Sequence, residues 1–287
     1  MRPALVALAV LILIVAIAPG IARALPGSLT RRYAEAVRAG LADPRPGPPV
    51  GEADLSRLPE IVRGYLRRAG VVGREPAWAT RAVFEGRIRN GPEAPWMPMS
   101  VEQYNFFPEG VRAFHLRSSL RGLPFEGLHL FDRSGARMTI RVGSILTVAE
   151  AAGPEMDQSE TVTVFNDMCL LAPSTLIDPA IAWEVVDPRS ARATFTRRGI
   201  TIRAVLRFNE LGDLVDFESD DRYQTSDGRT YVRHPWSTPV RDHAEVGGRR
   251  IWTRGDAVWS MPSGPFTYGE FRLVSIESNP ARGDRRP

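Results

Sequence analysis

Residues 153–179, GPEMDQSETVTVFNDMCLLAPSTLIDP, stand apart in a chain whose other segments mostly alternate apolar and polar residues as β-strands do. Asp157 and Glu160 have the spacing of a capping box, in which Asp157 would be the N-cap of a helix that ends at Leu171, before a proline. One face of this helix would be apolar, made by Val162, Phe165, Met168 and Cys169. We therefore predict an amphipathic helix over 157–171 that covers an apolar sheet face.

The segments on both sides of this helix have the composition of closely spaced strands separated by Pro, Gly and Asn turns. Gly247-Gly248 has the length and composition of a two-residue hairpin turn. Because such strands without interleaved helices form antiparallel meanders, we predict a mainly β (α+β) fold: a large curved antiparallel sheet or half-barrel with a few covering helices. The predicted strand segments are TRAVFEGRIR, MSVEQYNFF, VRAFHLRSSL, FEGLHLFD, ARMTIRVGSILTVAEA, ARATFTR, GITIRAVLRF, DLVDFESDDRYQ and RDHAEVGGRRIWTRGDAVWS.

Two further helices are predicted before the strands. Residues 54–70, DLSRLPEIVRGYLRRAG, carry a continuous apolar stripe, with Ser56 as a possible N-cap and Gly70 just past the end. A shorter helix over 28–41 precedes a Pro/Gly spacer. The predicted organisation is a membrane anchor or signal segment at 1–24, a juxtamembrane helix and linker at 25–53, a single antiparallel β domain at 54–278 and a disordered tail at 279–287.

The N-terminal segment contains fifteen consecutive apolar residues, from Ala4 to Ala18. A signal peptide has an apolar region of up to about 15 residues and a spanning helix needs about 20, so the segment falls between the two classes. We favour an uncleaved anchor over a signal peptide cleaved after Ala24 or a buried helix. Cleavage would place the protein outside the cytoplasm, whereas the arginines after the segment favour a cytoplasmic body, so the side of the membrane stays open.

The positive charge is concentrated near this segment. All 37 basic residues are arginine, which excludes chemistry that needs a lysine, such as Schiff-base catalysis. Residues 1–75 contain 11 arginines against 6 acidic residues, while the rest of the chain is close to neutral. A nucleic-acid-binding domain would carry its excess charge on the folded body, so we predict no nucleic-acid partner and favour membrane lipid instead.

Sequence motifs indicate no cofactor and no metal site. Cys169 lies in an apolar run and is predicted to be a buried, inert thiol. The four histidines lack metal-ligand spacing, although His115 and His129 could share a sheet face. Glu155 and Asp157 are the only acid pair we single out for a hydrolase, and acids at a helix start are also favoured by the helix dipole alone. We lean against an enzyme and leave the question open.

Aromatic residues and methionines are the remaining signal for a ligand. They are distributed through the predicted sheet, where they could form the core or line an apolar cavity. The predicted ligand-binding residues are Trp96, Met99, Tyr104, Phe165, Trp183, Trp236 and Trp252.

Several segments resemble a family of uncharacterised bacterial proteins, the DUF6544/DUF6920 type. The resemblance covers about residues 55–278 and implies no activity, cofactor or catalytic residue. The architecture it implies is similar to the half-barrel lipoprotein-carrier fold, a curved antiparallel sheet with helices on its concave side. The segments that carry it are LPEIVRGYLRRAGV, PWMPMSVEQY, GPEMDQSE, DPRSARATFTRRGITIRAVLRFNELGDLV after a tryptophan, and TPVRDHAEVGGRRI.

Three functions are consistent with this sequence. The preferred one is a membrane-attached protein that binds a hydrophobic ligand, a lipid or an acyl chain, in the cavity of the half-barrel. The alternatives are a hydrolase that uses the acidic pair in that cavity, and an envelope scaffold that docks a protein partner of unknown identity.

Overall fold

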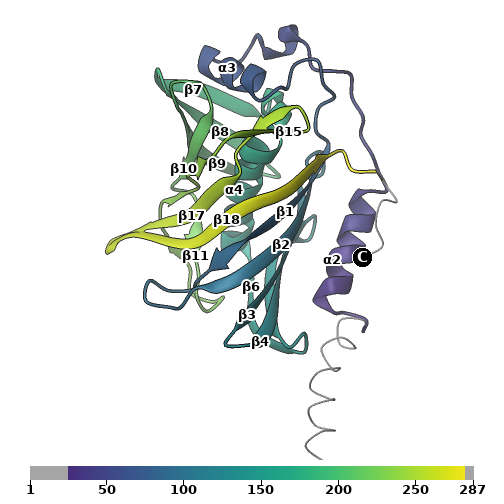
Figure 1. Cartoon of the computed structure of the whole chain (residues 1–287), viewed down its shortest axis with the longest axis vertical. Coiled ribbons are helices and arrows are strands. Elements are labelled where there is room, and N and C mark those ends of the chain that lie inside the picture. Colours follow the sequence, from purple (N-terminus) through teal and green to yellow (C-terminus); the bar gives the residue numbers. More distant parts are fainter. Residues whose placement is uncertain (1–24, 282–287) are drawn as a thin grey trace, which may run out of the picture.

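The structure, a computed structural model, describes residues 25–281 (Figure 1). The predicted membrane or signal segment and most of the predicted tail lie outside the described residues. The helices are α2 (Leu29–Gly40), α3 (Glu60–Arg68) and α4 (Pro154–Leu171), with short 3₁₀ helices η1 (Glu52–Leu55) and η2 (Pro173–Ile177).

Most of the chain forms one 14-stranded antiparallel sheet. The strands before α4 are β1 (Ala79–Ile88), β2 (Met97–Phe106), β3 (Val111–Leu120), β4 (Leu123–Asp132), β5 (Gly135–Val142) and β6 (Leu146–Ala152). Those after it are β7 (Ile181–Asp187), β8 (Ser190–Arg197), β9 (Ile200–Phe208), β10 (Leu214–Ser219), β11 (Tyr223–Gln224), β12 (Val232–Arg233), β13 (Trp236–Ser237), β14 (Val240–Arg241), β15 (Ala244–Val246), β16 (Arg249–Ile251), β17 (Arg254–Met261) and β18 (Gly264–Ser278).

The strand order shows two meanders joined in the middle of the sheet. It runs β6-β5-β4-β3-β2-β1-β18-β17-β13-β10-β9-β8-β7, with β14 paired to β17. Two separate hairpins, β11–β12 and β15–β16, lie beside the sheet. In the second, Val246 faces Arg249 across Gly247-Gly248, and both glycines have positive φ, as a two-residue hairpin turn requires. The predicted large curved antiparallel sheet and this turn are confirmed.

The helix α4 lies inside the curve of the sheet. It is the part of the chain that leads from β6 at one sheet edge to β7 at the other, and it contacts β5 and β6 on one side and β9, β10 and β11 on the other (Figure 1). The loop after β11 closes onto the first edge, where the Tyr231 hydroxyl donates to the Ala152 carbonyl at 3.1 Å. Of the 18 residues of α4, 14 are buried, so the helix occupies the space in which we predicted a ligand cavity.

The start of α4 differs from the prediction. Its N-cap is Gly153, whose φ of 110° suits glycine, and Pro154 begins the helix, as prolines often do. Asp157 is already inside the helix, and its Oδ1 accepts a hydrogen bond from the Ala136 N–H at 2.6 Å. Glu160 is buried and bonds to the sheet. The predicted capping box is therefore wrong, because both acids have partners from distant strands.

The helix predicted over 54–70 is shorter in the structure. Residues 52–55 form η1 instead, and α3 begins at Glu60 with Pro59 as its N-cap. A proline disfavours the helical conformation of the residue before it, which separates the two elements at Leu58. Gly70 has a φ of 72° just past the C-cap, as predicted.

The helix α2 confirms the prediction over 28–41 and packs on the convex face of the sheet (Figure 1). The Ser28 hydroxyl accepts a hydrogen bond from the Arg31 N–H at 3.2 Å and caps its start. Leu29 and Tyr33 form a buried cluster with residues of β3 and β4. A Cβ at Gly40 would lie 2.3 Å from the Phe106 ring, so glycine allows the close approach of α2 to the sheet.

Gly86 on β1 lies close to the backbone of β18, and it supports a first prediction. A Cβ there would lie 1.9 Å from the Glu270 carbonyl oxygen, a backbone atom that cannot turn aside. We expect Gly86→Ala to lower the free energy of unfolding by about 1–3 kcal/mol, measured by urea denaturation. Gly64→Ala in α3 is the control, because nothing lies within 4 Å of its Cβ. It should stabilise the protein by about 0.5–1 kcal/mol, and a loss of similar size in both variants would contradict the steric explanation.

Candidate functional site

A group of polar side chains joins α4 to β2 and β3 on the concave face of the sheet. The Arg112 guanidinium donates to the carboxylates of Asp167 (2.8 Å) and Glu160 (3.1 Å) and to the side-chain carbonyl of Gln103 (3.3 Å). Gln103 in turn donates to Asp167 at 2.7 Å. All four residues are buried, with Arg112 6% and Glu160 2% exposed. We call these four residues the interior cluster.

One guanidinium balances two carboxylates in this cluster. Burial alone would raise the pKa of Glu160, but the charge of Arg112 and a hydrogen bond from His129, whose Nδ1 lies 3.4 Å from Oε1, lower it to about 2. Burial raises the pKa of Asp167, and the same arginine only partly opposes this effect. Arg112 forms buried ion pairs with both Glu160 and Asp167, and these pairs hold α4 to the sheet.

The interior cluster lies outside the two pockets described below. Neither of the two best-formed pockets in the described part of the chain is lined by any of its members. Acid–base catalysis needs a substrate within hydrogen-bond reach of the carboxylate. The contacts of the interior cluster connect α4 to strands β2 and β3 of the sheet.

The predicted acid pair lies on the first turn of α4, away from both pockets. Asp157 is half-buried and committed to the backbone of β5, and Glu155 is also half-buried. The predicted histidine pair does not form, because His115 and His129 lie on opposite faces of the sheet. His115 lies under α2, where its Nε2 is 3.2 Å from Glu126 Oε2. His129 faces α4.

Four of the predicted ligand-binding residues belong to the core. Phe165 on α4 stacks on Phe195 of β8, and the Trp252 indole N–H donates to the Leu170 carbonyl at 3.1 Å. The remaining two of the four, Met99 and Trp236, are buried in the same cluster. These contacts account for the aromatic content of this region by packing.

The other three predicted ligand-binding residues lie far from one another in the structure. Tyr104 is on the convex face beside Tyr33 of α2, at 6.4 Å between ring centroids. Trp96 precedes β2 and has Arg87 and Arg89 over its ring. Trp183 is on the edge strand β7. The seven residues do not surround one common cavity, and their role in binding stays a prediction.

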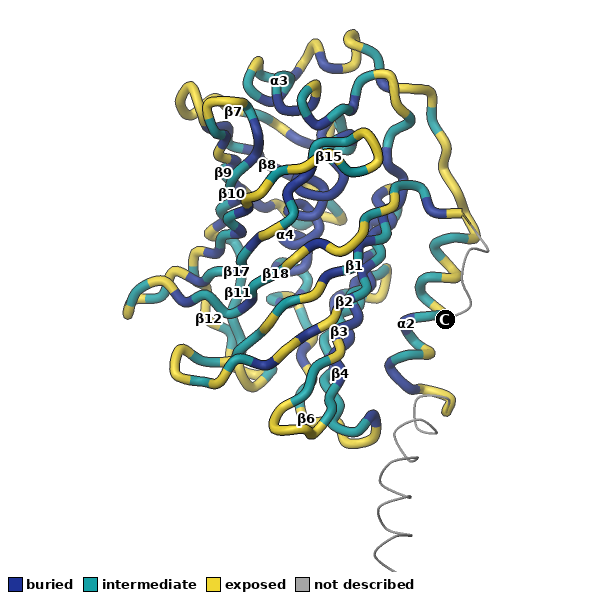
Figure 2. The backbone as a smooth tube through the Cα atoms, in the orientation of Figure 1, coloured by how far each residue is buried: buried dark blue, intermediate teal, exposed yellow. Residues whose placement is uncertain are grey.

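The tips of the β3–β4 and β5–β6 hairpins contain exposed residues (Figure 2), and several of these residues are large and apolar. The Gly143 N–H donates to the Pro124 carbonyl at 2.9 Å and holds the two tips together. Among the most exposed side chains are Leu123 (57%), Ile145 (64%) and Leu146 (63%). We call this surface the apolar rim; its residues are Leu120, Leu123, Ile145, Leu146 and Val148.

The first described residues, at the N-terminal end, lie next to the apolar rim. The Arg141 guanidinium on β5 donates to the Gly27 carbonyl at 3.1 Å, and Leu25 is exposed. Between residues 25 and 281, none of the helices is both long and apolar enough to span a membrane.

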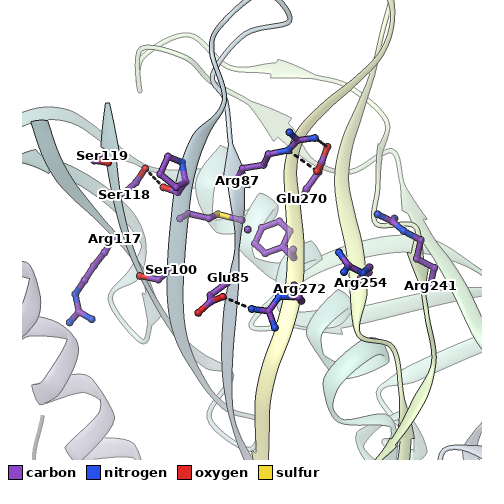
Figure 3. Close-up of a pocket in the computed structure, with 14 residues that line it drawn as sticks. Glu85, Arg87, Ser100, Arg117, Ser118, Ser119, Arg241, Arg254, Glu270 and Arg272 are labelled. Atoms are coloured by element: carbon purple, nitrogen blue, oxygen red, sulfur yellow. Dashed lines mark hydrogen bonds and ion pairs between the residues drawn. The ribbon is translucent and has the colours of Figure 1, made fainter. Parts of the chain in front are cut away.

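A hollow of about 730 Å³ lies on the convex face (Figure 3). We call it the convex groove. It crosses β17, β18, β1, β2 and β3 and is lined by five arginines, two glutamates and three serines among other residues. A smaller hollow of about 250 Å³ lies at the C-terminal end of α4, beside β15–β16. Within the described residues, no three or more His, Cys, Asp or Glu side chains come together as metal ligands would.

The sequence analysis did not identify the residues of the interior cluster or of the convex groove. Arg112 and Gln103 occupy inward positions of strands on which most other inward residues are apolar, such as Met99, Val101 and Leu116, and Asp167 lies in a helix segment rich in apolar residues. A charge at an apolar position was the available signal for the interior cluster. The convex groove has no such signal, because arginines at outward strand positions are ordinary.

Comparisons with known proteins identify a family and several similar folds. The model of a family of unknown function, DUF6544, matches residues 48–271. No curated protein matches the chain. A putative outer membrane lipoprotein-sorting protein domain from Vibrio parahaemolyticus is similar with a TM-score of 0.43 and 10% identity, over 78% of this chain and 93% of that one.

Two further solved structures are similar at comparable levels. A LolA superfamily protein from Nitrosomonas europaea has a TM-score of 0.37 and 12% identity, over 76% of this chain and 91% of that one. A DUF1329 family protein from Desulfovibrio piger has a TM-score of 0.38 and 10% identity, over 83% and 96%.

Proposed function

Because this chain belongs to DUF6544, a family of unknown function, we propose a role from its own geometry: a protein held at a membrane that binds lipid through its apolar rim. The observation that carries the proposal is the exposure of five large apolar side chains at one end of the sheet, beside the point where the N-terminal segment joins the body.

The interior of the sheet is a less favourable place for a lipid. The predicted cavity is filled by α4, and a lipid there would have to displace a helix with 14 buried residues and break the ion pair of the interior cluster. The rim needs no such rearrangement. Full burial of a leucine or isoleucine side chain contributes about 1.5–3 kcal/mol, so partial insertion of the rim would favour one orientation of the protein on a bilayer.

The charges near the rim suit the same surface. Arg121 lies exposed in the β3–β4 turn, and Arg141 lies on the neighbouring β5. Basic residues close to a membrane surface contribute about 1 kcal/mol each with anionic lipids. Leu25, which follows the apolar segment from Ala4 to Ala18 in the sequence, lies at this same end, and this supports attachment with the rim toward the lipid. The side of the membrane is left unassigned.

A fluorescent label at the rim tests this function. Cys169 is buried, so Leu123→Cys gives a single accessible thiol for an environment-sensitive dye. We expect the emission of the labelled full chain to shift to shorter wavelength when it is moved from detergent into phosphatidylcholine vesicles, and further when phosphatidylglycerol is added.

The matched control carries the dye at the other end of the sheet. Leu211 is 65% exposed in the β9–β10 turn, near Asp213, which bonds to Arg68 of α3. A dye on Leu211→Cys should keep an aqueous emission in the same vesicles. If both labels stay aqueous, or both shift equally, the rim is not the lipid-binding surface.

A further inference from the structure

Three arginines stand side by side on neighbouring strands of the convex groove. Arg241 on β14 faces Arg254 on β17, and Arg254 faces Arg272 on β18 (Figure 3). All three line the groove, and neighbouring strands are about 4.8 Å apart. Like charges directly opposite each other destabilise a sheet, so this arrangement, which we call the arginine row, is unfavourable without a counter-charge.

The counter-charges present within the protein are weakly held. Arg241 bonds to Asp256 at 2.8 Å, Arg254 lies 3.3 Å from Asp242, and Arg272 bonds to Glu85. The three arginine side chains are about half exposed, at 49%, 55% and 47%. Exposed ion pairs contribute little to stability, so an anion in the groove can replace these carboxylates as partner.

The groove continues beyond the arginine row, with two further donors, Ser100 and Arg117, on the far side of the acceptor Glu85. Along the same cross-strand row, Arg272 faces Glu85, Glu85 faces Ser100, and Ser100 faces Arg117 on β3. Arg117 has no ion-pair partner in the part of the chain that the structure describes. The groove volume of about 730 Å³ lies within the range of small-molecule sites, about 300–1,000 Å³.

We infer that the arginine row is a binding site for a phosphate group. A guanidinium presents two parallel N–H donors that match a pair of phosphate oxygens, and a phosphate has enough oxygens to bridge two neighbouring guanidiniums. The phosphate could belong to a lipid headgroup or to a soluble phosphate, since the recognised chemistry is the same. The inference does not depend on the apolar rim, which lies at the tips of other strands.

The test uses the full chain in dodecyl maltoside micelles, titrated with inorganic phosphate in one arm and with phosphatidylglycerol in mixed micelles in the other. Arg254→Gln removes the middle of the row and should weaken binding about tenfold or more. Asp242→Asn frees Arg254 from its internal partner and should tighten binding. Arg203→Gln, an exposed arginine on β9, is the matched control and should leave the affinity unchanged.

The possible results distinguish a soluble phosphate, a lipid headgroup and the absence of phosphate binding at the arginine row. Loss of inorganic phosphate binding in Arg254→Gln supports a soluble phosphate, and loss of phosphatidylglycerol binding alone supports a lipid headgroup. If neither probe depends on Arg254, or if Asp242→Asn weakens binding, the inference is overturned. The melting temperature of Arg254→Gln should not fall, because the substitution also removes like-charge repulsion, so weaker binding cannot be ascribed to unfolding.

Discussion

Arg112→Met should lower the free energy of unfolding by about 3–5 kcal/mol near neutral pH, because it leaves two buried carboxylates without their cation. Arg112 has the only guanidinium that bonds to Glu160 and Asp167 in the described chain, and all three side chains are buried. Urea denaturation of wild type and variant measures the loss. Arg117→Met, at an exposed position on the same strand, is the control and should change stability by no more than about 0.5 kcal/mol.

The loss should depend on pH. In the wild type the folded pKa of Glu160 is about 2, below its ordinary 4.5, so its stabilising contribution is present above about pH 4.5 and disappears as the pH falls toward 2. Without Arg112, burial would instead raise the pKa values of the carboxylates, and they would be protonated readily in acid. The difference between variant and wild type should therefore shrink from neutral pH to about pH 3. An equal loss at both pH values would show that Arg112 acts by packing alone.

Phe165→Ala should lower the free energy of unfolding by about 3–5 kcal/mol, because it leaves a cavity at the centre of the molecule. The Phe165 ring is fully buried, stacks on Phe195 at 4.9 Å and meets Phe217 edge-on at 5.8 Å. Thermal and urea unfolding measure the loss. Phe165→Leu keeps much of the volume and should cost less than half as much.

The same variant tests whether the interior can hold an apolar ligand. A cavity lined by apolar side chains stays dry and binds small apolar molecules, so benzene should raise the melting temperature of Phe165→Ala. The wild type, whose interior is filled by α4, should not respond. A comparable benzene effect on the wild type would mean that a cavity already exists beneath α4. The half-barrel interior would then again be a candidate lipid-binding site.

The strands and their turns follow from the sequence because each depends on local residues. Alternation of apolar and polar side chains indicates a strand with one buried face, and two glycines suit a two-residue turn wherever they occur. The helix α4 depends on more than local residues, because the sheet surrounds it. Asn166, for example, is buried and donates to Thr238 at 2.6 Å, although its polarity suggests a solvent-facing position. The spacing of apolar residues along a helix cannot indicate its buried face when nearly every face of the helix is buried.

The arginine row of the convex groove could not be predicted because it depends on strand register. The arginine row joins β14, β17 and β18, and a shift of one residue in any pairing would move an arginine to the other face. The histidines show the same effect: Phe114, not His115, faces His129 across β3 and β4. Registers of this kind follow from bulges and turns along the whole sheet, which the sequence alone does not specify.

The place of β18 in the sheet has a consequence for how the protein is made. This strand pairs with β1 on one side and with β17 on the other, so it joins the two meanders, yet it follows every one of their strands in the sequence. Until it is synthesised, β1 keeps an unpaired edge, and closing a contact so distant in the chain is slow. A chain terminated before Gly264 should therefore form two unjoined half-sheets and aggregate, so loss of the final strand should abolish the whole fold.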